Sequence, residues 1–479
     1  MQNLRFPPAW LWLVDELLPA YVKQHYSPRE SWKDKPFSIA DAEFFSKGIE
    51  ELSELFTDER PKKLPAYFAH PKFRSSYLLY FLPLQAAKFV SLFQIHSGAI
   101  RAAVKHGRET GVLRVLDLGA GPGTGSLALL LELLQYPLEA GESLPPIEMD
   151  WFDTQLPILK DGEALANTLA SHFPRLRGKL TIRLHTDPWW KAAQKLTSPT
   201  SLILVGHVLN EAPAPVSRAS RPQLAPGSEA EKFLREELPT SQAPGRTDHD
   251  RDSRDDHGNA GADDEYFGED EIPDFNEVHP DELTTPAVKG VNRPKFALSS
   301  ETAALAELAT RMSGGGMLIA EPANRRNSQL LSRIRDEFIA HQVVEAHARS
   351  IWGPCLHAGK CPLAEGRDWC HFSVPVEIPG RWFKGFSKAL GSERQWLKFA
   401  YLWLASPDFA SQVMPAFVRR VVSDPLSKFG AQESHVLICE PEVPVRLPVQ
   451  VRQAPHRGDL IENKNGTGWL PFGSQRHGR

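Results

Sequence analysis

A glycine-rich turn is the feature that most restricts what this chain can fold into. Residues 116–126 read LDLGAGPGTGS; they close the short apolar run 112–119 and lead into a strongly apolar stretch over 124–136. Glycine adopts backbone angles that other residues avoid, and it lets the main chain approach a ligand closely. A buried strand, such a turn and the free N–H groups of a helix N-terminus together form a nucleotide-binding turn. The glycines expected to line it are Gly119, Gly121 and Gly123.

Acidic residues occur at or just after the ends of three predicted strands. Asp117 lies near the end of the first, Asp153 ends the strand predicted over 146–153, and Asp187 follows the strand predicted over 180–185. We expect Asp117 to order the turn or to meet an ammonium group of the ligand. Asp153 is placed to accept hydrogen bonds from both hydroxyls of a ribose, and Asp187 to contact an adenine. The alternative for Asp153 and Asp187 is a helix N-cap.

The spacing of these residues separates two classes of cofactor. Proteins that bind NAD prefer G-x-G-x-x-G, with an acidic residue about 20 residues further on. Here the glycines follow G-x-G-x-G-x-G, and Asp153 lies about 30 residues beyond them, after a long loop. The pattern therefore favours S-adenosylmethionine (SAM) over NAD. A SAM site holds no phosphate, so the turn would make room for the amino-acid portion and the ribose.

Strands and helices alternate along the chain after this turn, which is typical of an α/β domain. Four more strands are predicted over 201–206, 316–321, 371–376 and 398–404. Because no obvious crossover helix joins the last two, we expect a mostly parallel sheet closed by an antiparallel edge strand. The predicted fold is a seven-strand, Rossmann-like class I SAM-dependent methyltransferase domain, formed by residues 106–211 and 296–404.

Polar residues follow the predicted fourth strand, in the segment VGHVLNEAP. Ligands of open α/β folds bind at this carboxyl edge of the sheet, and in many methyltransferases the same edge contacts the target base. The catalytic candidates are His207, Asn210 and Glu211. The alternative for each of them is a capped turn between a strand and a helix.

Three further regions flank or interrupt this domain. Residues 1–105 carry apolar side chains at helical spacing, which predicts an N-terminal helical region. Residues 212–295 are rich in proline, glycine and acidic side chains, which predicts a disordered acidic insert. Residues 405–479 are rich in valine, arginine and proline, and we expect them to form a small β subdomain that contains Cys439.

The net charge of -4 averages two different parts of the chain. Residues 246–282 hold 15 acidic and 3 basic residues, so the remainder is mildly basic, which is compatible with an RNA partner. Candidate phosphate contacts are Arg419, Arg420, Lys428, Arg446 and Arg452. No apolar run is long enough for a membrane span, and the N-terminus lacks the features of a signal peptide or mitochondrial presequence. We expect a cytoplasmic, bacterial protein that is monomeric and has no membrane contact.

Three of the four cysteines fall within 16 residues, in the predicted metal loop 348–370. They are Cys355, Cys361 and Cys370, and the fourth is Cys439. Four thiolates can hold either a zinc ion or an iron–sulfur cluster. The short C-x2–4-C knuckles of structural zinc are absent, and cysteines widely spaced on loops suit a larger cubane, but spacing alone leaves both metals open. His357 and His371 flank the cysteines and could replace one ligand.

Seven segments of the chain resemble one known family, in the order in which they occur there. They are YLLYFLP, LDLGAGPGTGS, GHVLNE, GGMLIAEP, CLHAGKCPL, DWCHFS and KFAYLWLA, spread over roughly 70–210 and 296–440. The family is the mitochondrial small-ribosomal-subunit methyltransferase-like family, which also has bacterial members. The resemblance implies a [4Fe–4S] cluster on the four cysteines and association with the small ribosomal subunit or its rRNA during assembly. The acidic insert departs from the family pattern.

Two functions remain open from the sequence. The first is an rRNA methyltransferase that binds SAM at the glycine turn, Asp153 and Asp187. The second is a non-catalytic ribosome assembly factor that keeps the fold and the cluster but transfers no methyl group. The NPPY-type tetrad of amino-methylating enzymes is absent, which favours the second function or a carbon or ribose-oxygen target. A small-molecule methyltransferase is a third alternative.

Overall fold

The computed structural model describes most of the chain outside residues 210–299. The described residues are 5–57, 67–138, 142–196, 198–209, 300–340, 350–357, 359–364, 368–391, 395–405, 418–426, 433–440, 444–450, 454–463 and 470–471. By its contacts the chain divides into two units, Met1–Pro213 with Leu298–Arg479, and Ala214–Ala297, and all described residues belong to the first. The predicted acidic insert 212–295 and the candidates Asn210 and Glu211 lie outside the described residues.

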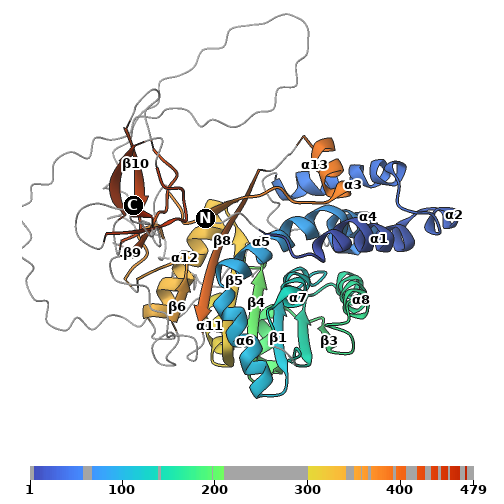
Figure 1. Cartoon of the computed structure of the whole chain (residues 1–479), viewed down its shortest axis with the longest axis horizontal. Helices are drawn as coiled ribbons and strands as arrows, with labels where there is room; N and C mark the ends of the chain where they lie inside the picture. Colours follow the sequence, from blue (N-terminus) through green and yellow to red (C-terminus); the bar gives the residue numbers. More distant parts are fainter. Residues whose placement is uncertain are drawn as a thin grey trace, which may run out of the picture. The chain divides into compact units, whose positions relative to one another are not determined.

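An eight-stranded sheet forms the centre of this unit (Figure 1). Seven strands follow the order β3-β2-β1-β4-β5-β8-β6, and β7 pairs with β8 beside them. The first five strands pair in parallel, whereas β8 is antiparallel to β5, β6 and β7. The strands are β1 (Leu113–Leu118), β2 (Ile147–Phe152), β3 (Leu180–His185), β4 (Thr200–Gly206), β5 (Met312–Pro322), β6 (Ser350–Gly353), β7 (Phe372–Pro375) and β8 (Trp396–Ala405). This order confirms the predicted Rossmann-like methyltransferase fold.

Each face of the sheet has its own apolar core, because side chains alternate between the two faces along a strand. Val115, Met149 and Leu204 contribute to one core, which contains residues of α5 (Leu82–Ile95), α6 (Ser97–Glu109), α7 (Thr124–Gln135) and α8 (Leu156–His172). Leu118 and Ile203 contribute to the other, with η4 (Trp189–Lys191), α9 (Ala192–Lys195), α11 (Ser300–Ala309) and α12 (Arg325–Ala340). Burial on both faces explains why these strands read as continuous apolar runs.

The order of the last strands differs from the prediction. The sixth strand along the chain is β6, which lies inside the segment 348–370 that was predicted to be a loop. The strand predicted over 371–376 is present as β7, but it pairs with β8 beside the main order. In addition, β8 lies between β5 and β6 instead of closing an edge. A four-residue strand such as SIWG depends on its partner more than on its own pattern, so its sequence does not reveal it.

Helices fill the region that was predicted to be helical. They are η1 (Trp12–Leu17), α1 (Leu18–Tyr26), α2 (Glu30–Lys33), α3 (Ile39–Thr57), η2 (Tyr67–Ala69), α4 (Pro71–Ser76) and η3 (Tyr77–Phe81). The prediction missed α13 (Arg381–Ala389), which connects β7 to β8 and packs against α3, η1 and η3 (Figure 1). Phe383 stacks on Tyr80 with ring centroids 5.2 Å apart, and Trp10 donates a hydrogen bond to Pro379 O at 2.9 Å.

One helical stretch among the described residues has the length and apolar character of a membrane span, contrary to the prediction. It covers Pro71–Ile95, and 83% of its most apolar window is buried inside the protein. A core helix passes the same test of length and composition. Because side chains such as Phe89 and Leu92 belong to the apolar core that includes Val115 and Leu204, the stretch packs as a core helix.

The C-terminal part contains short strands, as the composition of 405–479 indicates. Strands β10 (Glu433–Ile438) and β11 (Val445–Gln450) form an antiparallel pair, and β9 (Val418–Arg420), β12 (Leu460–Glu462) and β13 (Leu470–Pro471) form a second small sheet. Cys439 directly follows β10, and its backbone N–H donates to Arg420 O at 2.9 Å. The fourth cysteine is therefore held at the junction of the two small sheets.

Candidate functional site

The glycine turn between β1 and α7 has the backbone that its sequence predicts. Gly119, Gly121 and Gly123 all have positive φ values, of 65°, 52° and 69°. A Cβ atom on Gly119 would lie 1.7 Å from Val208 Cγ1, and one on Gly123 would lie 2.2 Å from Trp151 Cη2. At Gly121 the nearest atom would be 3.8 Å away, in Phe68. The first and third glycines are therefore tightly enclosed by side chains, whereas a Cβ on the buried Gly121 would make only an ordinary contact with Phe68.

Asp117, near the end of β1, stabilises this turn through hydrogen bonds to the first residues of α7. Its side chain is buried, and Oδ2 accepts hydrogen bonds from Ser126 N at 3.0 Å and from Ser126 Oγ at 2.7 Å. Burial raises the pKa of Asp117 to about 6, although the bonds from Ser126 lower it and the charge of Asp153 raises it further. The carboxyl thus ties the first turn of α7 to the end of β1, in agreement with one of its two predicted roles.

Asp153 contacts the same turn from the end of β2. Its Oδ2 accepts a hydrogen bond from Gly121 N at 3.1 Å, and its Oδ1 accepts one from Gln155 N at 2.9 Å. Burial raises the pKa of Asp153, while these two backbone bonds lower it. The N-cap of α8 is Gln155 itself, so Asp153 does not fill the N-cap position that was its alternative interpretation. The structure brings Asp117 and Asp153 together at the turn.

Asp187 has a different set of contacts. It forms an ion pair with Lys195 of α9, and this hydrogen bond lowers the pKa of Asp187. Among the described residues, the charges that lower its pKa are those of Lys195, Lys191 and His185, and none of these belongs to the glycine turn. The structure therefore joins two of the three predicted acidic residues and leaves the third in a local ion pair.

The segment after β4 packs directly on the turn. His207 has a φ of 60°, a left-handed conformation that is uncommon for residues other than glycine, and its N–H donates to Ala320 O at 2.9 Å. The side chain of the next residue, Val208, packs directly against Gly119. Strained backbone of this kind is frequent at functional sites. His207, at the carboxyl edge of the sheet, therefore remains a catalytic candidate.

A buried carboxylate that the sequence analysis did not select supports this segment. Glu321, at the end of β5, is fully buried, and its Oε1 accepts a hydrogen bond from Leu209 N at 3.0 Å. Its Oε2 accepts a longer one from Asn327 Nδ2, at 3.5 Å. The signal was present in the segment GGMLIAEP, in which an acidic residue ends an otherwise apolar strand. Glu321 fixes the backbone next to His207 and Val208.

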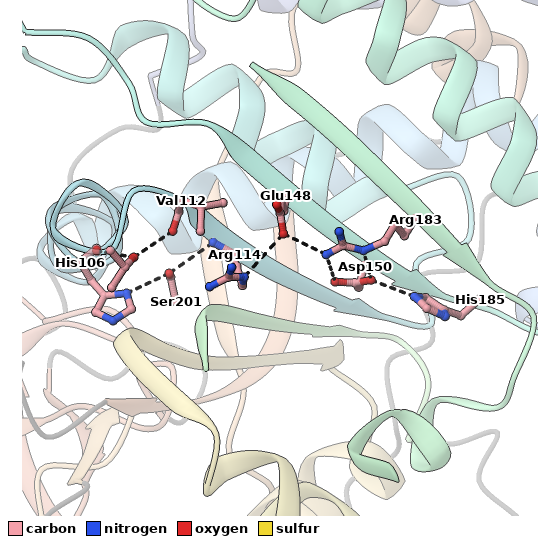
Figure 2. Close-up of polar contacts among 9 residues, drawn as sticks. His106, Val112, Arg114, Glu148, Asp150, Arg183, His185 and Ser201 are labelled. Atoms are coloured by element: carbon pink, nitrogen blue, oxygen red, sulfur yellow. Dashed lines mark hydrogen bonds and ion pairs between the residues drawn. The ribbon is translucent and has the colours of Figure 1, made fainter. Parts of the chain in front are cut away.

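A polar ladder that the sequence analysis also missed crosses β1, β2 and β3 (Figure 2). Arg114 on β1 pairs with Glu148 on β2, which also pairs with Arg183 on β3. Burial raises the pKa of Asp150, but hydrogen bonds from His185 and Arg183 outweigh this and hold the pKa at about 2. The ladder is visible in the sequence only as charged residues two positions apart on neighbouring strands. It stabilises β1, β2 and β3 in the register that places Asp153.

The four cysteines are brought together in space. Cys355 follows β6, Cys361 lies in the loop after it, Cys370 precedes β7, and Cys439 follows β10. All four are free thiols, and each interacts electrostatically with the other three. Three of them pack with Leu363, Val422 and Leu437 in a small apolar cluster. Burial, and then the neighbouring thiols, raise the pKa values of Cys370 and Cys439 above their ordinary range.

Four thiols are a donor set that either a zinc ion or an iron–sulfur cluster can use. Among the described residues, no three side chains of the His, Cys, Asp or Glu type are placed to hold one metal ion. A cubane spreads its four iron atoms over a wider space, so its thiolates lie farther apart than those around one zinc ion. His357 Nε2 lies 3.3 Å from Cys439 Sγ, whereas His371 Nδ1 contacts Trp369 O at 3.2 Å. Of the two histidines, His357 is the one with a hydrogen-bond contact to a thiol.

Two of the predicted phosphate contacts are used inside the protein. Arg419 pairs with Glu440, and Arg420 donates to Pro354 O at 2.7 Å and to Gly458 O at 2.9 Å. Arg446 is exposed on β11, and Lys428 and Arg452 lie outside the described residues. The structure therefore leaves Arg446 as the described candidate for an external phosphate. Arg420 instead holds the backbone next to Cys355.

Comparison with known protein families places part of the chain in one of them. Residues 298–456 match the family described as mitochondrial small ribosomal subunit Rsm22. This match supports the resemblance that the sequence motifs indicate, over a segment that contains β5 to β8 and all four cysteines. No curated protein sequence matches the chain.

Proposed function

We propose that this protein is a SAM-binding, methyltransferase-like protein that acts on the small ribosomal subunit or its rRNA during ribosome assembly, in the cytoplasm. The observation that carries the SAM proposal is the glycine turn at the carboxyl end of β1, with Asp117 and Asp153 bonded to its backbone. The family matched by residues 298–456 is described as a small ribosomal subunit protein, which supports the ribosomal partner.

The residues at the turn would hold SAM in different ways. Gly121 leaves room for the ligand, Asp153 would accept hydrogen bonds from the ribose, and Asp117 would place negative charge near its ammonium group. When bound, SAM supplies an activated methyl group. Transfer needs a nucleophile positioned in line with that group and little else, so His207 and its neighbours Asn210 and Glu211 would orient the target.

We propose further that the four cysteines bind a [4Fe–4S] cluster that joins the loop before β7 to the C-terminal strands. Zinc is the alternative. Anaerobic purification followed by iron, sulfide and zinc analysis decides between them: about four iron atoms per chain support the cluster, and zinc without iron contradicts it. The cluster would act as a structural link, since its ligands come from parts of the chain that are far apart in sequence.

The test of the enzymatic proposal is methyl transfer to small subunits from a strain that lacks the protein. We expect label from SAM to appear in the rRNA with the wild-type protein and to disappear with Asp117→Ala. Glu109→Ala is the matched control, because the exposed Glu109 carboxylate pairs with Lys105 on α6 and not with the turn. If neither the wild type nor any variant transfers label, but all bind and restore assembly, the protein is a non-catalytic assembly factor. The absence of an NPPY-type tetrad after β4 favours that second candidate or a carbon or ribose-oxygen target.

SAM binding is expected to strengthen as the pH rises through about 6. Asp117 has a raised pKa of about 6, so below that pH the ligand-free protein holds a proton that a cationic ligand must displace. The affinity should therefore fall between about pH 7 and about pH 5. The same raised pKa adds stability to the ligand-free fold below about pH 4, and this is lost as the pH rises through about 6.

Titration calorimetry across this pH range measures the effect. Asp117→Asn should bind SAM more weakly at neutral pH and show a smaller pH dependence, while Glu109→Gln, which changes an exposed carboxylate of α6, should behave as the wild type does. An unchanged pH dependence in Asp117→Asn would assign the effect to another group, of which Asp153, with its raised pKa, is the first to test.

A further inference from the structure

A buried arginine of α12 shapes the loop that carries the first two cysteines. Arg335 is 1% exposed, and its guanidinium donates hydrogen bonds to Gly359 O at 2.8 Å and to His357 O at 2.5 Å. The adjacent Asp336 accepts a hydrogen bond from Cys361 N at 3.0 Å and pairs with Arg335. Two neighbouring residues of one helix thus hold the main chain between Cys355 and Cys361 at three points.

The same arginine also determines which nitrogen of His357 carries the proton. Arg335 Nη2 lies 3.4 Å from His357 Nδ1. A guanidinium only donates hydrogen bonds, so Nδ1 accepts, and the proton of the neutral imidazole is on Nε2. That nitrogen lies 3.3 Å from Cys439 Sγ and therefore points an N–H donor at the sulfur. The contact links the loop after β6 to the cysteine that follows β10.

A third property of Arg335 is its fixed positive charge. It interacts electrostatically with Cys355 and Cys361, and its side chain is nearly inaccessible to water. A permanent cation in such a place offsets the negative charge of thiolates much more strongly than an exposed one does. Hydrogen bonds to ligand sulfurs and nearby charge are the means by which a protein adjusts the reduction potential of an iron–sulfur cluster.

We propose that Arg335 is the positioning residue of the four-cysteine site, and that it makes His357 a hydrogen-bond donor to Cys439 instead of a metal ligand. The inference rests on the proposed cluster. Arg335 holds the Cys355–Cys361 loop in its binding shape before the group arrives. It also supplies positive charge beside two ligands and, through His357, a hydrogen bond to a third.

The test compares three variants of the full-length protein with a matched control. Arg335→Met removes the charge and the hydrogen bonds, Arg335→Lys keeps the charge but loses the planar fork, and His357→Leu removes the donor to Cys439 alone. Arg333→Met is the control, because Arg333 is exposed on the same helix. Each protein is purified anaerobically, and its iron and sulfide content, rate of iron loss to a chelator and cluster midpoint potential are measured.

We expect Arg335→Met to lose iron roughly 10-fold to 100-fold faster than the wild type, as is usual when a partner of the metal ligands is removed. Arg335→Lys should also lose iron faster, with a midpoint potential nearer that of the wild type. His357→Leu should keep its iron but shift to a more negative potential, because a reduced cluster carries more negative charge and gains more from the N–H donor. Arg333→Met should match the wild type.

Two results would overturn these assignments separately. If His357→Leu and both Arg335 variants keep the wild-type potential and rate of iron loss, Arg335 and His357 have no role at the site although the cluster exists. If the purified His357→Leu protein instead contains less iron than the wild type and has a changed electronic spectrum, His357 is a metal ligand and not a hydrogen-bond donor. A wild-type protein without iron instead refutes the proposed cluster itself, and this inference with it. If Arg335→Met does not fold, the iron loss and midpoint potentials of Arg335→Lys and His357→Leu still test the roles of Arg335 and His357.

Discussion

Gly123→Ala is expected to destabilise the protein by about 2–5 kcal/mol and to abolish SAM binding. Two costs add at this position. An alanine with the φ of 69° found at Gly123 pays for the left-handed conformation. Its Cβ would also lie 2.2 Å from Trp151 Cη2, and the indole of Trp151 is fully buried in the core. The ring cannot move aside, so the turn itself must shift, and the turn carries the predicted ligand site.

Urea unfolding and SAM titration measure the two effects, and Gly178→Ala provides the matched control. Gly178 has nearly the same φ, 70°, but a Cβ there would meet no atom within 4 Å. The control should therefore show the backbone cost alone, about 1–2 kcal/mol, with SAM binding intact. If the two variants lose the same stability, Trp151 does not enclose Gly123 as the structure indicates.

The glycine turn could be predicted because its information is local. Gly119, Gly121 and Gly123 follow an apolar strand directly, and the backbone conformation that each adopts is a property of glycine itself. Strands β1, β4 and β5 were recognised for the same reason, since each is a largely apolar run that both faces of the sheet bury. Asp117 and Asp153 were found because their positions at strand ends are fixed once the strands are known.

The parts that the sequence did not reveal depend on contacts between distant residues. Strand β6 is four residues long and is defined by pairing with β8, more than forty residues later. Asp187 stands at a strand end as Asp153 does, and only the structure shows that Lys195 pairs with it. Arg335 reads as one of several basic residues on an amphipathic helix, and its burial against the cysteine loop depends on how α12 packs.

The second large effect is expected at Asp161, where the N-terminal helices join the methyltransferase domain. Asp161 on α8 is buried, and its carboxylate accepts hydrogen bonds from Tyr21 at 2.9 Å and from Tyr26. Arg74 of α4 lies 3.2 Å from the same carboxylate. Burial, and then Asp161 itself, raise the pKa of Tyr21, so this phenol stays protonated and donates. One carboxylate thus accepts from two phenols of α1 and pairs with an arginine of α4.

Asp161→Ala should cost about 2–4 kcal/mol, because it leaves two phenols without their acceptor and the half-buried Arg74 guanidinium without its counter-ion. Asp161→Asn should cost less, since the amide oxygen still accepts one or two of these bonds. Lys160→Ala is the matched control, as Lys160 is exposed on the same helix. Urea unfolding measures the loss of stability, and limited proteolysis shows whether cleavage of residues 5–57 increases.

The effect should extend to the SAM site through the next residue of α8. Gly162 packs so closely on the glycine turn that a Cβ there would lie 2.3 Å from Pro122 O. A shift of α8 toward the space left by the Asp161 side chain therefore moves the backbone between Gly121 and Gly123. SAM affinity should fall in Asp161→Ala and remain unchanged in Lys160→Ala. Loss of stability with wild-type SAM affinity would mean that the N-terminal helices stabilise the fold without supporting the turn.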